Sequence, residues 1–124
     1  LANSENRDLD IVINATLLST LYLQAKEFAL VERMADMLLV SGARRANWFA
    51  VADGHIMHSS LSLMEGNLAE AIDRLVRAIL KLQQLVPGAA INTLKGRLAE
   101  LRNELGADVF DPHYQQAIRV HRPA

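Results

Sequence analysis

Apolar side chains recur every three or four residues along most of the chain, the spacing that places them on one face of an α-helix. Residues 8–24 and 28–40 show this spacing, and it returns in four later segments. No segment alternates apolar and polar residues over the length of a strand. The pattern therefore predicts an all-α protein of about six helices.

Breaks in the apolar pattern divide the chain into three helical hairpins. Glycine or proline marks three breaks, at residues 41–43, 87–88 and 106–107. Short connections between helices favour antiparallel neighbours. We therefore expect antiparallel hairpins over residues 8–41, 45–86 and 89–120, stacked as a short α-α superhelix.

Capping residues predict where some helices begin and end. Asn67 with Glu70 three residues later forms a capping box, which satisfies free N–H groups at a helix start. Gly106 is expected to end the fifth helix as its C-terminal cap. Asp111 followed by Pro112 predicts the start of the last helix, because proline lacks only an N–H that would have no partner there.

Two segments present well-defined apolar faces. The third segment places five residues on one side of a helix: Phe49, Ala52, Ile56, Ser59 and Leu63. The fifth segment has a narrower stripe, with charged residues on the remaining faces, formed by Ile91, Leu94, Leu98, Leu101 and Leu105. We interpret this leucine stripe as a packing seam against one neighbouring helix, within the chain or in a second copy.

Composition narrows the class of protein. The 124 residues are 51% hydrophobic and 22% charged, which suits one domain over residues 1–124 that needs no disulfide or metal. No cysteine is present, which excludes thiol catalysis and favours a cytoplasmic protein. A net charge of -1 argues against a nucleic-acid or membrane partner. Because the chain begins with Leu1, we expect it to be a piece of a longer polypeptide.

The chain contains an internal repeat with an offset of 40 residues, which lays Lys26 on Gly66. In each copy a short turn is followed by a large apolar residue, Phe28 or Leu68, at the start of a helix. Further apolar positions correspond in order: Leu21 with Leu61, Leu23 with Leu63, Val31 with Ala71, Ala35 with Leu75 and Leu38 with Ala78.

This repeat resembles the tetratricopeptide repeat. The second copy matches the small, glycine, large and alanine positions of that family at Ser59, Gly66, Leu68, Ala71, Leu75 and Ala78. The spacing is about six residues longer than the usual 34, and we expect the excess in residues 42–47, between hairpins. Such long repeats are similar to those of large bacterial signal-transducing ATPase regulators, the class of the maltose-regulon activator. The segment Asn47-Trp48-Phe49 and the ending over residues 101–110 add to the likeness.

Candidate chemistry is sparse. Asp53, His55 and His58 form a D-x-H-x-x-H cluster in which the two imidazoles lie on one helix face, but a third strong metal ligand is missing nearby. No H-E-x-x-H pair, phosphate-binding glycine loop or nucleophile elbow occurs. We therefore expect no enzyme, no cofactor and no metal site, with a small metal-dependent enzyme at Asp53, His55 and His58 as the weakest alternative.

The resemblance implies a non-catalytic module of a bacterial regulatory protein. Its partner would be a protein, a peptide, an effector or another domain of the same polypeptide, and a homodimer is an open alternative. Polar and aromatic residues expected in the binding groove are Asn14, Leu18, Tyr22, Trp48, His55 and His58. For Trp48, packing at the start of a helix competes with ligand binding. The second hypothesis is a free-standing chaperone or adaptor of the tetratricopeptide type, with a helical client.

Overall fold

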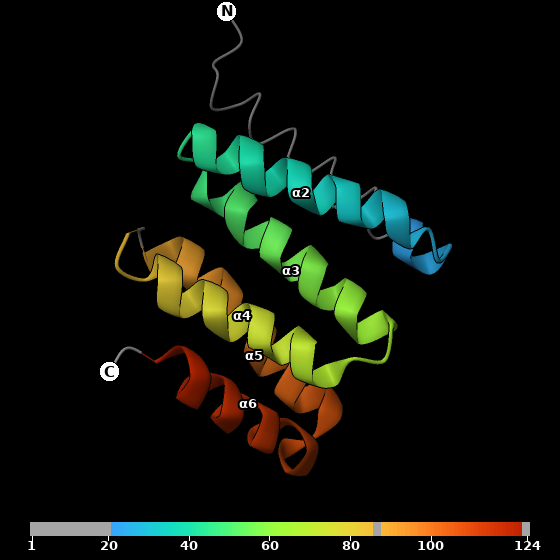
Figure 1. Ribbon diagram of the computed structural model, residues 1–124, viewed down its shortest axis with the longest axis vertical. Helices are drawn as coiled ribbons and strands as arrows, with labels where there is room; N and C mark the ends of the chain where they lie inside the picture. Colours follow the sequence, from blue (N-terminus) through green and yellow to red (C-terminus); the bar gives the residue numbers. More distant parts are fainter. Residues whose placement is uncertain (1–20, 86–87, 123–124) are drawn as a thin grey trace, which may run out of the picture.

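The computed structural model describes residues 21–85 and 88–122, so most of the first predicted helix lies outside the described residues. Residues 21–24 are helical and form the end of that element. No strand occurs in the described part, and the predicted all-α fold is confirmed (Figure 1). The labelled helices are α2 (Phe28–Arg44), α3 (Trp48–Met64), α4 (Leu68–Leu82), α5 (Gly88–Leu105) and α6 (Ala107–His121).

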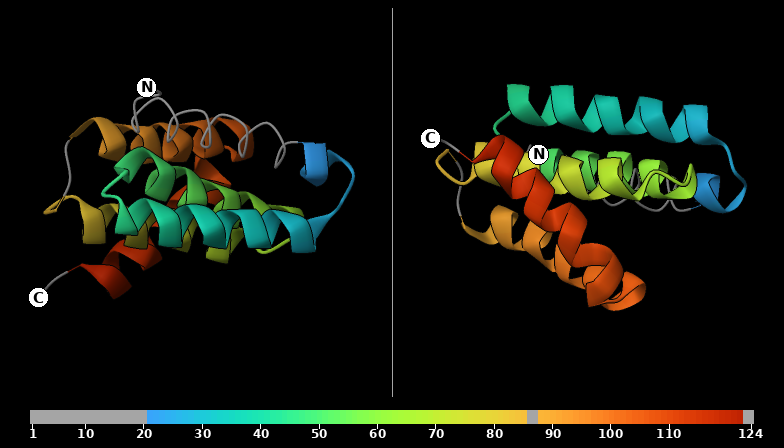
Figure 2. Two further views of the ribbon diagram at one scale, coloured as in Figure 1. Left: turned by 90° about the horizontal axis from the view of Figure 1, so that it is seen from above. Right: turned by 60° about the horizontal axis from the view of Figure 1, so that its bottom comes forward.

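Helices α2, α3 and α4 follow one another as antiparallel neighbours (Figure 1). Helix α5 contacts both α3 and α4, and α6 lies mainly against α4 (Figure 2). Among the labelled helices, α2 contacts α3 alone. The relation of α6 to α4 therefore does not copy that of α4 to α2, as a strictly regular stack of hairpins would require.

Helix α3 lies at the centre of the fold and is buried on several sides. Its residues contribute to two apolar clusters, one shared with α2 and the other with α4, α5 and α6. The two clusters are centred on Val31, Ala35, Leu38, Met57 and Leu61, and on Ile72, Leu75, Leu94, Leu101 and Phe110. A helix that contacts neighbours on several sides needs no polar face, and this explains why Ala50, Val51 and Met57 are buried in addition to Ala52 and Ser59.

The connections after residues 24, 44 and 64 are the same turn. In each, the middle residue has a left-handed backbone, at Lys26 (φ 60°), Ala46 (φ 53°) and Gly66 (φ 83°). The N–H groups of residues 27, 47 and 67 donate to the carbonyls five residues earlier, and those of residues 26, 46 and 66 donate to the carbonyls three residues earlier. These are the two bonds of a Schellman motif. The residue that closes each motif also serves as the N-cap of the next helix.

The repeated turn sets a spacing of 20 residues between helix starts, at Phe28, Trp48, Leu68 and Gly88. Two such units make the 40-residue offset found in the sequence. Burial follows the same offset, because Val31 and Ala71, Ala35 and Leu75, and Leu38 and Ala78 are all buried. The expectation of extra residues between hairpins is wrong: α2 and α3 have 17 residues each, and the extra length lies in the helices.

Several predicted boundaries are also wrong. Gly42 is buried inside α2, which continues to Arg44. Helix α4 ends at Leu82, since the following Leu85 is exposed and has no core to enter. Phe49, predicted to face inward, is 53% exposed because the start of α3 turns that side to solvent.

The last helix starts earlier than predicted. Helix α6 begins at Ala107, and Pro112 lies inside it. The positive φ of Gly106 (86°) lets the chain restart a helix at once, and the earlier start buries Phe110. Asp111 therefore caps no helix. Its carboxylate accepts hydrogen bonds from Arg102 instead.

Helices α2 and α3 approach closely at two glycines. A Cβ on Gly54 of α3 would lie 2.9 Å from the Cγ of Leu39 and 3.0 Å from the carbonyl oxygen of Ala35. A Cβ on Gly42 of α2 would lie 3.0 Å from the Cβ of Ala50. These glycines are required by the space between the helices and not by a turn.

The shared turn predicts opposite effects of glycine and alanine at equivalent positions. Ala46→Gly is expected to stabilise the protein by about 0.5–1 kcal/mol, because it removes the strain of a left-handed alanine. Gly66→Ala is expected to destabilise it by about 1 kcal/mol. Urea unfolding measures both. Ala99→Gly, on the exposed middle of α5, is the control and should lose about 1 kcal/mol; a similar loss for Ala46→Gly would contradict the turn assignment.

The close approach of α2 and α3 predicts that a single methyl group separates two kinds of glycine. Gly54→Ala should lower the free energy of unfolding by about 1–3 kcal/mol, since the carbonyl of Ala35 belongs to a packed helix and yields little. Gly96→Ala in α5 is the matched control, because its Cβ would meet no atom within 4 Å. That variant should gain up to about 1 kcal/mol. Equal effects of the two changes in urea unfolding would refute the packing argument.

Candidate functional site

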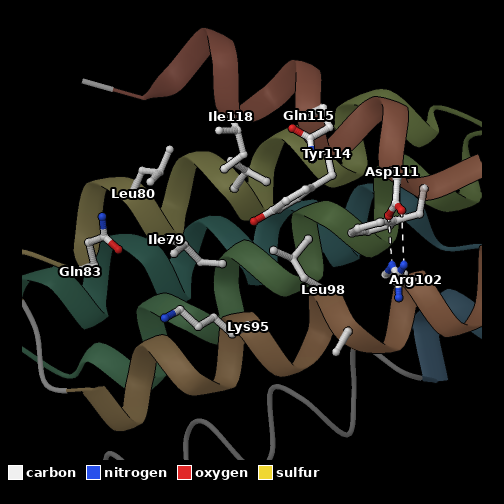
Figure 3. A pocket seen from close by; sticks show the side chains of 13 residues that line it. Ile79, Leu80, Gln83, Lys95, Leu98, Arg102, Asp111, Tyr114, Gln115 and Ile118 are labelled. Atoms are coloured by element: carbon white, nitrogen blue, oxygen red, sulfur yellow. Dashed lines mark hydrogen bonds and ion pairs between the residues drawn. The ribbon is translucent and has the colours of Figure 1, made fainter. Parts of the chain in front are cut away.

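A groove of about 450 Å³ opens between α5 and α6, with α4 as its floor (Figure 3). Each helix contributes a stripe along its length. The lining consists of Val76, Ile79, Leu80 and Gln83 from α4 and its C-terminal turn, of Lys95, Leu98, Ala99 and Arg102 from α5, and of Phe110, Asp111, Tyr114, Gln115 and Ile118 from α6.

The stripes show that the groove is elongated. On α4 and α5 the lining residues have the spacing i, i+3, i+4 and i+7, and on α6 the same spacing runs from Asp111 to Ile118. This spacing marks one face of a helix over about two turns, or about 10 Å. The groove is therefore a trough that runs along the helices.

The walls of the trough are mainly apolar. The rings of Phe110 and Tyr114 are stacked, with centroids 5.7 Å apart and an angle of 18° between their planes. Phe110 is buried and anchors α6 in the core, while Tyr114 and Ile118 remain partly exposed at the groove. Ala99 on the opposite wall is exposed and offers only a methyl group, which leaves room for an occupant.

The two ends of the trough differ in charge. At one end, Arg102 donates two hydrogen bonds to Asp111, at 3.0 and 3.3 Å. This contact lowers the pKa of Asp111 and raises that of Arg102, mainly through the side-chain hydrogen bonds. At the other end lie Lys95 and Gln83 (Figure 3). Lys95 has no acidic partner among the described residues, so this end carries an uncompensated positive charge.

The predicted packing seam is internal to the chain. Ile91, Leu94, Leu98 and Leu101 are buried in the main apolar cluster, and Leu105 is partly buried against it. Leu98 also reaches the groove. The stripe thus packs against helices of the same chain in the described structure.

The residues predicted to line one groove lie in different places. Asn14 and Leu18 are outside the described residues. Tyr22 packs against the cluster shared by α2 and α3, whereas Trp48 packs against the cluster shared by α3 to α6. Helix α3 separates these two clusters, so the two aromatic side chains do not meet.

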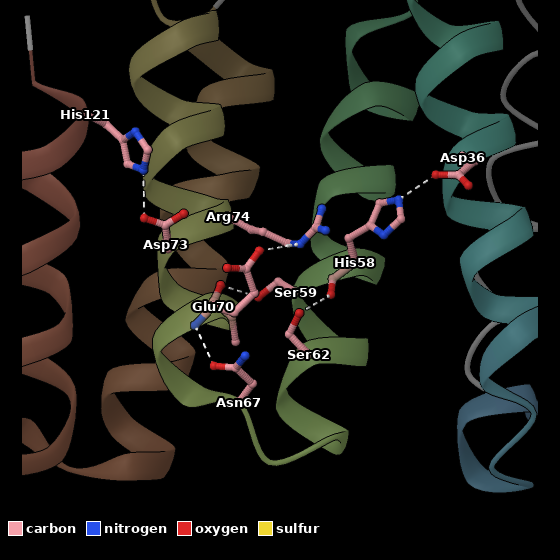
Figure 4. A network of polar contacts seen from close by, with 10 residues as sticks. Asp36, His58, Ser59, Ser62, Asn67, Glu70, Asp73, Arg74 and His121 are labelled. Atoms are coloured by element: carbon pink, nitrogen blue, oxygen red, sulfur yellow. Dashed lines mark hydrogen bonds and ion pairs between the residues drawn. The ribbon is translucent and has the colours of Figure 1, made fainter.

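His55 and His58 lie on α3 within a row of polar contacts that crosses several helices (Figure 4). The Nε2 of His58 donates to Asp36 of α2 at 2.9 Å, and Ser59 donates to the carbonyl of Ala71 in α4 at 2.7 Å. On the far side of α4, His121 donates to Asp73 at 2.7 Å. These contacts tie α3 to α2 and to α4, and α6 to α4.

Arg74 belongs to the same row. Its Nε lies 3.2 Å from a carboxylate oxygen of Glu70, an ion pair whose geometry does not include a hydrogen bond. Burial lowers the pKa of His55 to about 4, helped by the positive charges of His58, Lys81, Arg74 and Arg77. His55 is therefore neutral at neutral pH.

The D-x-H-x-x-H cluster is not assembled as a metal site in the part of the chain that is described. His58 turns to Asp36 on another helix. Residues 21–85 and 88–122 contain no group of three histidine, aspartate or glutamate side chains that could hold a metal ion.

Sequence reasoning identified the apolar residues of α6 but missed the groove. Phe110, Tyr114 and Ile118 were expected to face inward, and two of them line an open trough. Lys95 and Gln83 carried no sequence signal, because their role depends on how far α6 lies from α5. The single residue between α5 and α6 is the one sequence feature that could have indicated an unusual angle.

In comparisons with protein-family models, with curated proteins and with solved structures, no match to this chain was found. Among the described helices, none has the combination of length and apolar character needed to cross a membrane.

The low pKa of His55 predicts acid sensitivity. Between about pH 6.5 and pH 4 the unfolded chain binds a proton at this residue and the folded chain does not, so stability should fall as the pH decreases. His55→Gln should remove on the order of 1–2 kcal/mol of this loss, less than the full shift implies because the ring is partly exposed. Urea unfolding at several pH values measures the slope. His113→Gln is the control, and an equal change there would contradict the assignment.

Proposed function

We propose that this chain is a non-catalytic binding module of the tetratricopeptide-like class, belonging to a bacterial regulatory or signalling protein. Its partner would be a protein, a peptide or an effector held in the groove between α5 and α6. The groove is the observation that carries the proposal, because it combines apolar walls with a few polar groups at its ends.

The repeated architecture supports the class of module. Three identical turns and a 20-residue spacing of helix starts make each hairpin a copy of the one before in residues 21–82. Repeating helical hairpins form extended surfaces that suit binding better than catalysis. The different position of α6 is a departure from that regularity, and it is also what opens the groove.

The alternative of a free-standing chaperone or adaptor uses the same groove for a helical client. A metal-dependent enzyme at Asp53, His55 and His58 receives less support, because Asp36 engages His58 and the region around His55 is positively charged. A positive environment disfavours a bound cation.

Photo-cross-linking tests the binding function. A benzoylphenylalanine at Gln115, on the groove wall, should form discrete adducts in cells that naturally make the protein, and the same group at Glu32 on α2 should not. Ala99→Arg should remove the Gln115 adducts by filling the trough. Adducts identified by mass spectrometry that persist in Ala99→Arg, or that form equally at Glu32, would count against the proposal.

The size of the natural polypeptide separates the module from the chaperone. An antibody against this chain should detect a protein several times larger than 13.7 kDa if the chain belongs to a multidomain regulator. A band near 13.7 kDa would favour the chaperone or adaptor and would leave the groove as its client site.

A further inference from the structure

The groove between α5 and α6 has the shape of a seat for one more helix. Its lining runs along three helices for about two turns, so an occupant lies parallel to them and not across them. A partner helix that enters such a trough inserts side chains at positions i, i+3, i+4 and i+7. The small side chain of Ala99 allows close approach on one wall.

The fold already contains a helix seated in this way. Helix α5 contacts both α3 and α4, and it does so with the apolar stripe that includes Leu94, Leu98 and Leu101. Charged residues such as Glu100 and Glu104 occupy its outer face. An amphipathic helix is thus the kind of element that packs between two helices of this protein.

Charge indicates the polarity of the occupant. Arg102 is neutralised by Asp111 at one end of the trough, whereas Lys95 at the other end has no acidic partner in the described part of the chain. Gln83 and Gln115 add amide groups along the edge. A carboxylate on the occupant near Lys95 would supply the missing negative charge.

We propose that the groove binds an amphipathic helix of a partner protein, with apolar side chains against Leu80, Tyr114 and Ile118 and an acidic residue facing Lys95. This inference rests on the proposed binding function and specifies its partner.

Two synthetic helical peptides test the proposal. Both have the length of α5, 18 residues, and leucines at alternating three- and four-residue spacing. One carries glutamates on the turns beside the leucine stripe, and the other carries lysines at the same positions. Fluorescence anisotropy of the labelled peptides measures binding to the full chain, and circular dichroism checks that each variant is folded.

The acidic peptide should bind more tightly than the basic one. Lys95→Glu should weaken binding of the acidic peptide about five- to tenfold and improve that of the basic peptide, the effect of replacing one partly exposed attraction by a repulsion. Lys81→Glu on the outer side of α4 is the matched control and should leave the ratio of the two affinities within about twofold. Ala99→Arg should remove binding of both peptides, whereas Ala89→Arg, on the exposed start of α5, should not.

Other results would overturn the inference in distinguishable ways. If both peptides bind equally and Lys95→Glu changes neither, the acidic partner is wrong. If neither binds while Gln115 still cross-links a partner in an Ala99-dependent manner, the helical occupant is wrong and the binding function stands. Peptide binding that survives Ala99→Arg would place the interaction outside the groove.

Discussion

The left-handed residue between successive helices is the constraint on which the rest of the structure depends. At Lys26, Ala46 and Gly66 one residue with positive φ lets the chain close a Schellman motif and start the next helix immediately. Because each turn has the same hydrogen bonds, each helix reverses direction in the same way and lies beside its predecessor. Helix α3 is thereby enclosed by α2 and α4, and it also meets α5. Its buried glycine, alanines and serines follow from this position.

The groove arises where that constraint is not repeated. Only Gly106 separates α5 from α6, so the two helices meet at a sharp angle and diverge (Figure 2). The leucine stripe of α5 is held by the main core, whereas α6 is held against α4 by Phe110, Ala117 and the contact between His121 and Asp73. The diverging helices leave part of α4 uncovered. The apolar residues there would cost less free energy if a partner covered them.

The polar contacts of α3 illustrate how tertiary structure changes the meaning of a motif. Spacing alone placed His55 and His58 on one helix face, and the structure has them there. Yet Asp36, 22 residues away in sequence, engages His58, and the basic residues of α4 surround His55. A local cluster that suggested a metal is thus part of the contacts between helices. The same dependence on distant residues explains why Lys95 went unnoticed as a binding candidate.

The sequence by itself determined the helical class, the apolar faces of most helices and the 40-residue repeat, because these depend on side-chain periodicity within single segments. It also indicated the turn at Gly66, where glycine tolerates the left-handed backbone. It did not reveal the equivalent turns at Lys26 and Ala46, because those residues adopt that backbone only when packing of the flanking helices offsets its cost. Helix ends, the crowding around Gly54 and the angle between α5 and α6 were decided by tertiary structure. They depend on how close two helices lie, a distance that no single segment contains.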